Sequence, residues 1–125
     1  MTMYELPKHF DAHCFVGRSL YEIAFNANQV RLMFDSGLRI VVEGTMVLAN
    51  AAIPSKSTDS PININPQNPD VQLLNLIEAQ VESAWIDEKR FNLTLAFSNG
   101  RTLALIGGDP YECYKIQNGK EELIV

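Results

Sequence analysis

The chain has 125 residues, a length that predicts one domain with one hydrophobic core. Hydrophobic residues make up 46% of it and charged residues 20%, proportions that exclude a disordered or fibrous chain. Fifteen acidic and ten basic residues give a formal net charge of −5. This charge argues against nucleic acid as the partner and is compatible with a basic protein partner.

No stretch approaches the ~20 apolar residues that a membrane span requires, and the N-terminal residues lack the basic and apolar regions of a secretory signal. We therefore expect a cytoplasmic protein with no membrane partner. Cys14 and Cys113 are the only cysteines. They are too far apart in sequence for a C-x-x-C metal or redox motif, and we expect both thiols to be reduced.

The first 43 residues predict a short helical segment followed by three strands. Pro7 suits the first turn of a helix, and Gly17 ends that segment. Alternating apolar residues then predict strands over residues 19–25, 29–34 and 38–43. These strands form an antiparallel meander because short turns connect them.

The turn between the second and third of these strands contains Gly37, and Gly100 occupies the same place in a later turn. Both positions predict a positive φ, which glycine adopts at little cost. Serine is a poor occupant of the left-handed region, so Ser36 argues against a type I′ turn. A type I turn followed by a glycine bulge is therefore expected in both copies.

Residues 54–69 contain four prolines and almost no apolar bulk. This composition predicts a long exposed loop and not a strand. Loops of this length in small domains are usually either functional or disordered.

The second half of the chain repeats the order of helix and strands. Asp70 is placed to cap a short helix over residues 71–77, with Val71, Leu74 and Ile77 on one side. The strands predicted after this helix cover residues 80–86, 93–97 and 103–105, then 111–116, and finally 123–125, with Asn118-Gly119 as a hairpin turn.

Residues 16–42 and 77–105 are two copies of one design. Val30, Leu32 and Phe34 recur 63 residues later as the Leu93, Leu95 and Phe97 pattern. We therefore predict a mainly β (α+β) fold in residues 1–125. Two repeated antiparallel hairpin or meander units would pack as a small sandwich or half-barrel, with one or two short helices and a C-terminal hairpin.

No arrangement of residues predicts catalysis, a metal or a cofactor. His9 and His13, with Cys14, have helical spacing for two ligands but lack a distant group to complete a metal site. Adjacent acids such as Glu121 and Glu122 point to opposite faces of a strand, so they do not form an acid–base pair. We expect a non-enzymatic protein.

The best candidates for binding a partner are aromatic and acidic residues outside the repeated positions. Tryptophan and tyrosine dominate the energetics of protein interfaces, and nearby carboxylates suit a basic partner. The predicted partner-binding residues are Trp85, Asp87, Glu88, Tyr111, Glu112 and Tyr114. A symmetric homodimer through the exposed terminal strand is also compatible with this pattern.

The alternative hypothesis is a small-molecule binder, for example a protein that sequesters a nucleotide. Arg31, Arg39 and Arg101 are the candidate anion-binding groups. In this interpretation Arg39 would line a pocket together with Tyr111 and Tyr114.

Two L-x-F-x-x-G hairpins and a C-terminal P-Y-E-x-Y motif together resemble a family of small bacterial proteins of unknown function. The residues that carry the resemblance are Gly17, Leu20, Val30, Leu32, Phe34, Gly37 and Ile40, then Val81 to Ala84 and Leu93 to Leu105, and finally Asp109 to Tyr114. Small size, acidity and the absence of a catalytic motif also resemble the immunity proteins of bacterial toxin systems. That resemblance implies direct binding of a cationic toxin.

Overall fold

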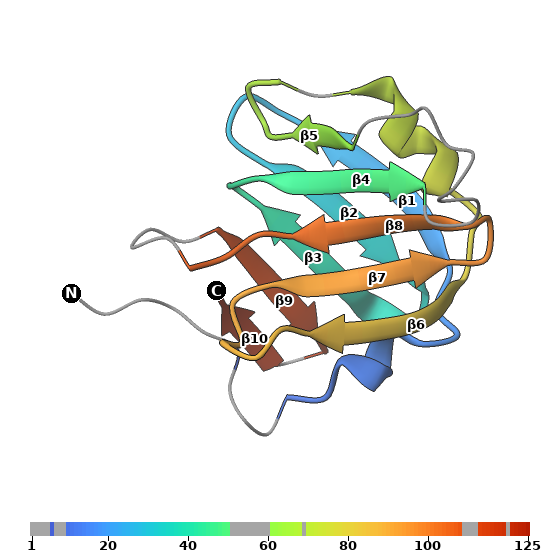
Figure 1. The fold of residues 1–125 in the computed structure, drawn as a ribbon, viewed down its shortest axis with the longest axis vertical. Helices are drawn as coiled ribbons and strands as arrows, with labels where there is room; N and C mark the ends of the chain where they lie inside the picture. Colours follow the sequence, from blue (N-terminus) through green and yellow to red (C-terminus); the bar gives the residue numbers. More distant parts are fainter. Residues whose placement is uncertain (1–5, 7–9, 51–60, 69, 109–112, 120) are drawn as a thin grey trace.

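The computed structural model describes residue 6 and residues 10–50, 61–68, 70–108, 113–119 and 121–125 (Figure 1). These residues form ten strands and three short 3-10 helices. The strands are β1 (Leu20–Phe25), β2 (Val30–Phe34), β3 (Leu38–Val42), β4 (Met46–Asn50), β5 (Ile62–Ile64), β6 (Val81–Ile86), β7 (Leu93–Phe97), β8 (Arg101–Leu105), β9 (Tyr114–Asn118) and β10 (Glu121–Ile124). The helices are η1 (Ala12–Phe15), η2 (Asp35–Gly37) and η3 (Val71–Leu76).

The strands make two antiparallel sheets that pack face to face as a small β-sandwich (Figure 1). The strand order is β1-β2-β3-β9-β10 in the first sheet and β5-β4-β8-β7-β6 in the second. The predicted mainly β fold of two repeated antiparallel units is therefore confirmed. The sandwich, and not the half-barrel, is the form it takes.

Each sheet combines the three strands of one repeat with the two strands that follow the other repeat. After β3 the chain crosses to the second sheet, where β4 pairs with β8. After β8 it crosses back, and β9 pairs with β3. The expected C-terminal hairpin is present as β9–β10. A second hairpin that was not predicted, β4–β5, occupies the corresponding place in the other sheet. The two repeats are therefore interleaved, because the hairpin after each repeat pairs with the last strand of the other repeat in the same way.

The repeats meet at a crossing point that has approximate two-fold symmetry. The Gly17 N–H donates to the Val81 carbonyl at 2.8 Å, and the Glu78 N–H donates to the Leu20 carbonyl at 2.7 Å. Ser19 and Gln80 pair with each other between these bonds. Equivalent residues lie 61 positions apart in the sequence, so the two copies hydrogen-bond reciprocally.

The core lies between the sheets because alternate residues of each strand point inward. Val30, Leu32 and Phe34 of β2 are buried, and the inward residues of β7 are buried opposite them. The Phe34 ring meets Phe15 edge to face at a centroid distance of 5.6 Å. Burying each of these large side chains contributes roughly 1.5–3 kcal/mol.

The prediction of an exposed loop over residues 54–69 is wrong at Ile62–Ile64, which form β5. Ile64 is fully buried and pairs with Met46 of β4. An Ile-Asn-Ile alternation suits a short edge strand, and prolines are tolerated where they flank such a strand. Residues 54–60 and 69 lie outside the described residues.

The side of η3 that faces the core is not the one that carries Val71 and Leu74. Leu73 and Leu76 are buried, whereas Val71 is 78% exposed and Leu74 45% exposed. A 3-10 helix has three residues per turn, so positions 71 and 74 share one side and positions 73 and 76 another. The predicted cap is confirmed, because the Asp70 carboxylate accepts a hydrogen bond from the Gln72 N–H at 2.9 Å.

The two glycine turns differ from each other. Gly37 and Gly100 both have positive φ as predicted, and a hydrogen bond from the Gly100 N–H to the Phe97 carbonyl closes the second turn. In the first turn Ser36 itself is left-handed, with φ 60° and ψ 27°, contrary to expectation. The Arg18 guanidinium binds the Asp35 carbonyl there, and the second copy has alanine at the position equivalent to Arg18.

Candidate functional site

Trp85 lies on β6, an edge strand of the second sheet, and is 49% exposed. Its register partners across the outer face are Thr94 of β7, then Ala104 of β8 and Val47 of β4. These neighbours are small and uncharged. We call this outer surface the Trp85 face, which comprises Trp85, Thr94, Ala104 and Val47 together with the next row, Asp87, Asn92 and Ile106.

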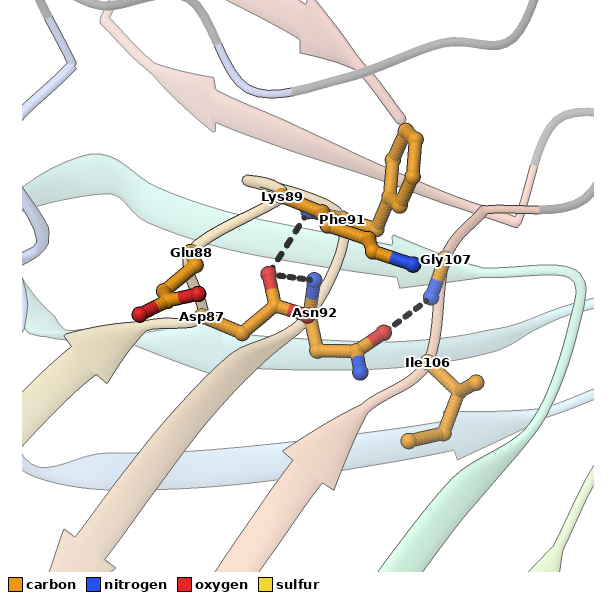
Figure 2. Close-up of a pocket in the computed structure, with 7 residues that line it drawn as sticks. All are labelled: Asp87, Glu88, Lys89, Phe91, Asn92, Ile106 and Gly107. Carbon is orange, nitrogen blue, oxygen red and sulfur yellow. Dashed lines mark hydrogen bonds between the residues drawn. The ribbon is translucent and has the colours of Figure 1, made fainter.

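The turn after β6 organises one end of the Trp85 face. The Asp87 carboxylate accepts hydrogen bonds from the Phe91 N–H at 2.9 Å and the Asn92 N–H at 3.1 Å. The Asn92 side-chain oxygen accepts a hydrogen bond from the Gly107 N–H at 2.9 Å, which ties the turn to the end of β8 (Figure 2). Asp87 therefore holds the turn in addition to placing an acidic group at the surface.

An open cavity of about 520 Å³ lies at this turn. It is lined by Asp87, Glu88, Lys89, Phe91, Asn92, Ile106 and Gly107 (Figure 2). The side chains of Glu88 and Lys89 are exposed and extend to opposite sides of the turn (Figure 2). Such a surface can hold a partner's cationic and polar groups, but it brings no acid and base together on one reacting atom.

Gly107 permits the close approach that shapes this cavity. A Cβ added at Gly107 would overlap the Phe91 carbonyl, so only glycine fits here without a backbone shift. The packing role of Gly107 depends on β8 ending beside the β6–β7 turn, which the sequence pattern does not show.

Tyr114 was predicted to bind a partner, and the structure contradicts this. Its side chain is only 1% exposed, and its hydroxyl donates to the Phe91 carbonyl at 2.8 Å. Burial raises the pKa of the Tyr114 phenol well above its usual range, and the charges of Asp87 and Cys113 raise it further. Tyr114 is therefore a core residue beneath the turn. Tyr111 and Glu112 lie outside the described residues.

The alternative pocket of arginines and tyrosines is not formed. Arg31 and Arg39 lie on strands of the first sheet, whereas Arg101 begins β8 in the second. Arg39 is exposed on the outer face, while Tyr114 points into the core. Arg39 and Tyr114 therefore cannot line one pocket.

Within the described residues there is no group of three or more His, Cys, Asp or Glu side chains that could hold a metal ion. Asp11 instead caps η1 by accepting a hydrogen bond from the His13 N–H at 2.9 Å, and His9 is not among the described residues. No helix in the described part of the chain has the length and apolar character needed to cross a bilayer.

A second hollow contains none of the predicted site residues. A cavity of about 310 Å³ lies between β1 and η3, lined by Ile23, Phe25, Asp70, Val71 and Leu74. We call it the β1–η3 groove. The signal that could have found it is the three-residue period of a 3-10 helix, which separates Val71 and Leu74 from Leu73 and Leu76.

The fold is a small antiparallel β-sandwich of interleaved repeats with two open hollows at its surface. The model of a family of unknown function, DUF6188, matches residues 12–125, and the chain belongs to this family. The expected membership of an uncharacterised family is thereby confirmed. No curated protein and no solved structure matches the sequence.

Proposed function

We propose that the chain is a non-enzymatic protein-binding module, an immunity protein that neutralises a basic bacterial toxin in the cytoplasm by direct binding. The observation that carries this proposal is the half-exposed Trp85, whose cross-strand neighbours Thr94, Ala104 and Val47 are small and uncharged. Exposed tryptophans on flat surfaces are typical centres of protein interfaces. The small neighbours leave the ring accessible to a partner.

The acidic end of the Trp85 face supports a basic partner. Asp87 and Glu88 follow Trp85 directly on the chain, and the whole chain carries a net charge of −5. Complementary charge raises the rate at which two proteins associate and favours one partner over others. We therefore assign Trp85 to affinity, and Glu88 to the rate and the salt dependence of association.

The test is binding to the purified product of the reading frame adjacent to the gene of this chain. Trp85→Ala is expected to weaken binding by about 2 kcal/mol, roughly 30-fold in Kd, as for a central interface residue. Glu88→Gln is expected to slow association and to reduce its dependence on salt. Isothermal titration calorimetry and stopped-flow fluorescence measure these two effects.

The matched control is Glu22→Gln, which removes an exposed acid from β1 in the other sheet. It should leave both the Kd and the association rate unchanged. Absence of any complex with the wild-type protein, or equal effects of Glu88→Gln and Glu22→Gln, would contradict the proposal. A growth assay with the co-expressed toxin gives a second readout, because Trp85→Ala should protect less well than the wild type.

A further inference from the structure

Apolar side chains are unevenly distributed over the surface of the described residues. The large hydrophobic residues that are exposed are Tyr21, Phe25, Val71, Leu74 and Trp85. Phe25, Val71 and Leu74 all line the β1–η3 groove. Grouped exposed apolar side chains mark interaction sites more often than scattered ones do.

The internal repeat allows the β1–η3 groove to be compared with the equivalent region of the other copy, which lies between β6 and η1. Residues that lie 61 positions apart are equivalent near the crossing point, so η1 corresponds to part of η3, and β6 to β1. η1 packs against β6, whereas the groove of about 310 Å³ separates η3 from β1. The two helices lie at opposite ends of the molecule (Figure 1).

Leu6 and Phe10 lie beside η1 and the turn after β6. Phe10, which is equivalent to Val71, is only 8% exposed and meets the Phe15 ring of η1 edge to face. Leu6 is 1% exposed, and the Arg90 guanidinium donates to the Leu6 carbonyl at 2.9 Å and to the Phe10 carbonyl at 3.1 Å. Both apolar side chains are thus buried in this copy, whereas 78% of Val71 remains exposed in the other.

Two features of the β1–η3 groove indicate the kind of ligand that it could bind: the adjacent edge strand β1 and the charge of Asp70. β1 is the edge strand of the first sheet, and beyond Leu20, whose backbone bonds to Glu78 and Ala79, no strand of the described residues pairs with its outer side. Extended peptides bind at such edges by adding a strand and placing alternate side chains in an adjacent groove. Asp70 contributes the only charged side chain of the groove lining, and it favours a cationic group on the peptide.

We propose that the β1–η3 groove binds an extended segment of a partner protein that carries two apolar side chains and a lysine or arginine. The apolar side chains contact Phe25, Val71 and Leu74, as the buried Phe10 packs against Phe15 of η1 in the other copy. The cationic side chain pairs with Asp70. This surface is separate from the Trp85 face, so the inference does not rest on the proposed function.

The test is selection of phage-displayed random peptides of about nine residues, long enough at about 3.3 Å per residue to span the six-residue β1. Selection uses the full chain, with counter-selection on the double variant Val71→Asp/Leu74→Asp. Both side chains are exposed, so the variant should keep the wild-type melting temperature. Enriched peptides are expected to share two apolar residues and a lysine or arginine.

An enriched peptide is then synthesised, and its affinity is measured by fluorescence anisotropy. The double variant should bind at least about tenfold more weakly, since it places charge against apolar side chains. Asp70→Asn should weaken binding about threefold at low salt and less at high salt. The asparagine oxygen can still accept the Gln72 N–H, so this variant retains the helix cap.

Two variants serve as controls. Gln72→Asp adds a charge to the same helix at an exposed position outside the groove lining and should leave peptide binding unchanged. Trp85→Ala should also leave it unchanged, which separates this inference from the proposed function. Failure to enrich peptides, enrichment of peptides without a basic residue, or equal binding by the double variant would overturn the inference. A wild-type dimer that the double variant converts to a monomer would instead identify a second copy as the occupant.

Discussion

Tyr114 links the core to the turn that carries the candidate site. Its hydroxyl donates to the Phe91 carbonyl at 2.8 Å, and Phe91 lies between the Asp87 and Asn92 ends of that turn. A buried carbonyl without its donor costs about 1–3 kcal/mol. We therefore expect Tyr114→Phe to lower the free energy of unfolding by about 1 kcal/mol at pH 7, measured by urea denaturation.

The same bond predicts a pH dependence. The pKa of Tyr114 is raised in the folded state, above an unfolded value of about 10. Folding therefore holds the phenolic proton more tightly. Its contribution to stability is complete below pH ~10 and is lost as the pH rises toward the folded pKa. The stability difference between wild type and Tyr114→Phe should shrink over this alkaline range.

Tyr21→Phe is the control, because Tyr21 is 58% exposed. It should match the wild type in stability at neutral pH, because substitutions of exposed side chains usually change stability little. A Tyr114→Phe variant as stable as the wild type at pH 7 would show that this hydrogen bond contributes nothing. A difference that stayed constant through the alkaline range would contradict the raised pKa.

Individual residues show which parts of the site could be predicted. Trp85 was predicted to bind because its residue type is rare and its neighbours are acidic, and the structure places it at the surface. Tyr114 was mistaken for a binding residue because alternation along a strand separates two faces without telling which one is buried. Which face of β9 is buried depends on its pairing with β3. This pairing joins distant parts of the chain.

At the scale of elements, local patterns located the strands that alternate strongly. β1, β2, β6 and β7 lie within the predicted ranges because each alternates and is bounded by turn residues. β5 was missed because proline-rich flanks outweighed three alternating residues. Its strand conformation depends on pairing with β4, so local sequence alone does not predict it.

The attachment of the N-terminal segment gives a prediction at this scale. Arg90 donates to the carbonyls of Leu6 and Phe10, and the Arg90 carbonyl accepts from the Leu6 N–H at 2.7 Å. Arg90→Met keeps the length of the side chain but removes its donors. We expect it to lower the free energy of unfolding by about 2 kcal/mol, since hydrogen bonds to charged groups contribute about 1.5–3 kcal/mol each.

Amide hydrogen exchange identifies where the Arg90→Met variant loosens. Exchange should become faster in residues 10–16, around η1. In β7 the free energy of exchange should fall only as far as the free energy of global unfolding does. The control is Lys89→Met, which removes the adjacent exposed cation and should change neither stability nor exchange. Unchanged exchange in residues 10–16 of Arg90→Met would contradict a clamping role for Arg90.

The whole molecule depends on the interleaving of its repeats. The first sheet needs β9 and β10, which follow the second repeat, and the second sheet needs β4 and β5, which follow the first. Local patterns identified two similar units but not this exchange, because antiparallel pairing of adjacent strands would explain the same sequence. In the interleaved fold neither repeat can bury its apolar face alone.

This topology predicts that the two halves of the chain fold only together. Residues 1–69 contain η1 and β1 to β5, and residues 70–125 contain η3 and β6 to β10. Each fragment alone should lack a cooperative thermal transition, because its three-stranded meander loses the partner hairpin and the facing sheet. An equimolar mixture should regain a cooperative transition by circular dichroism, together with the native fluorescence of Trp85. A fragment that unfolds cooperatively by itself would show that the repeats are independent units, and the interleaved pairing would then contribute little to folding.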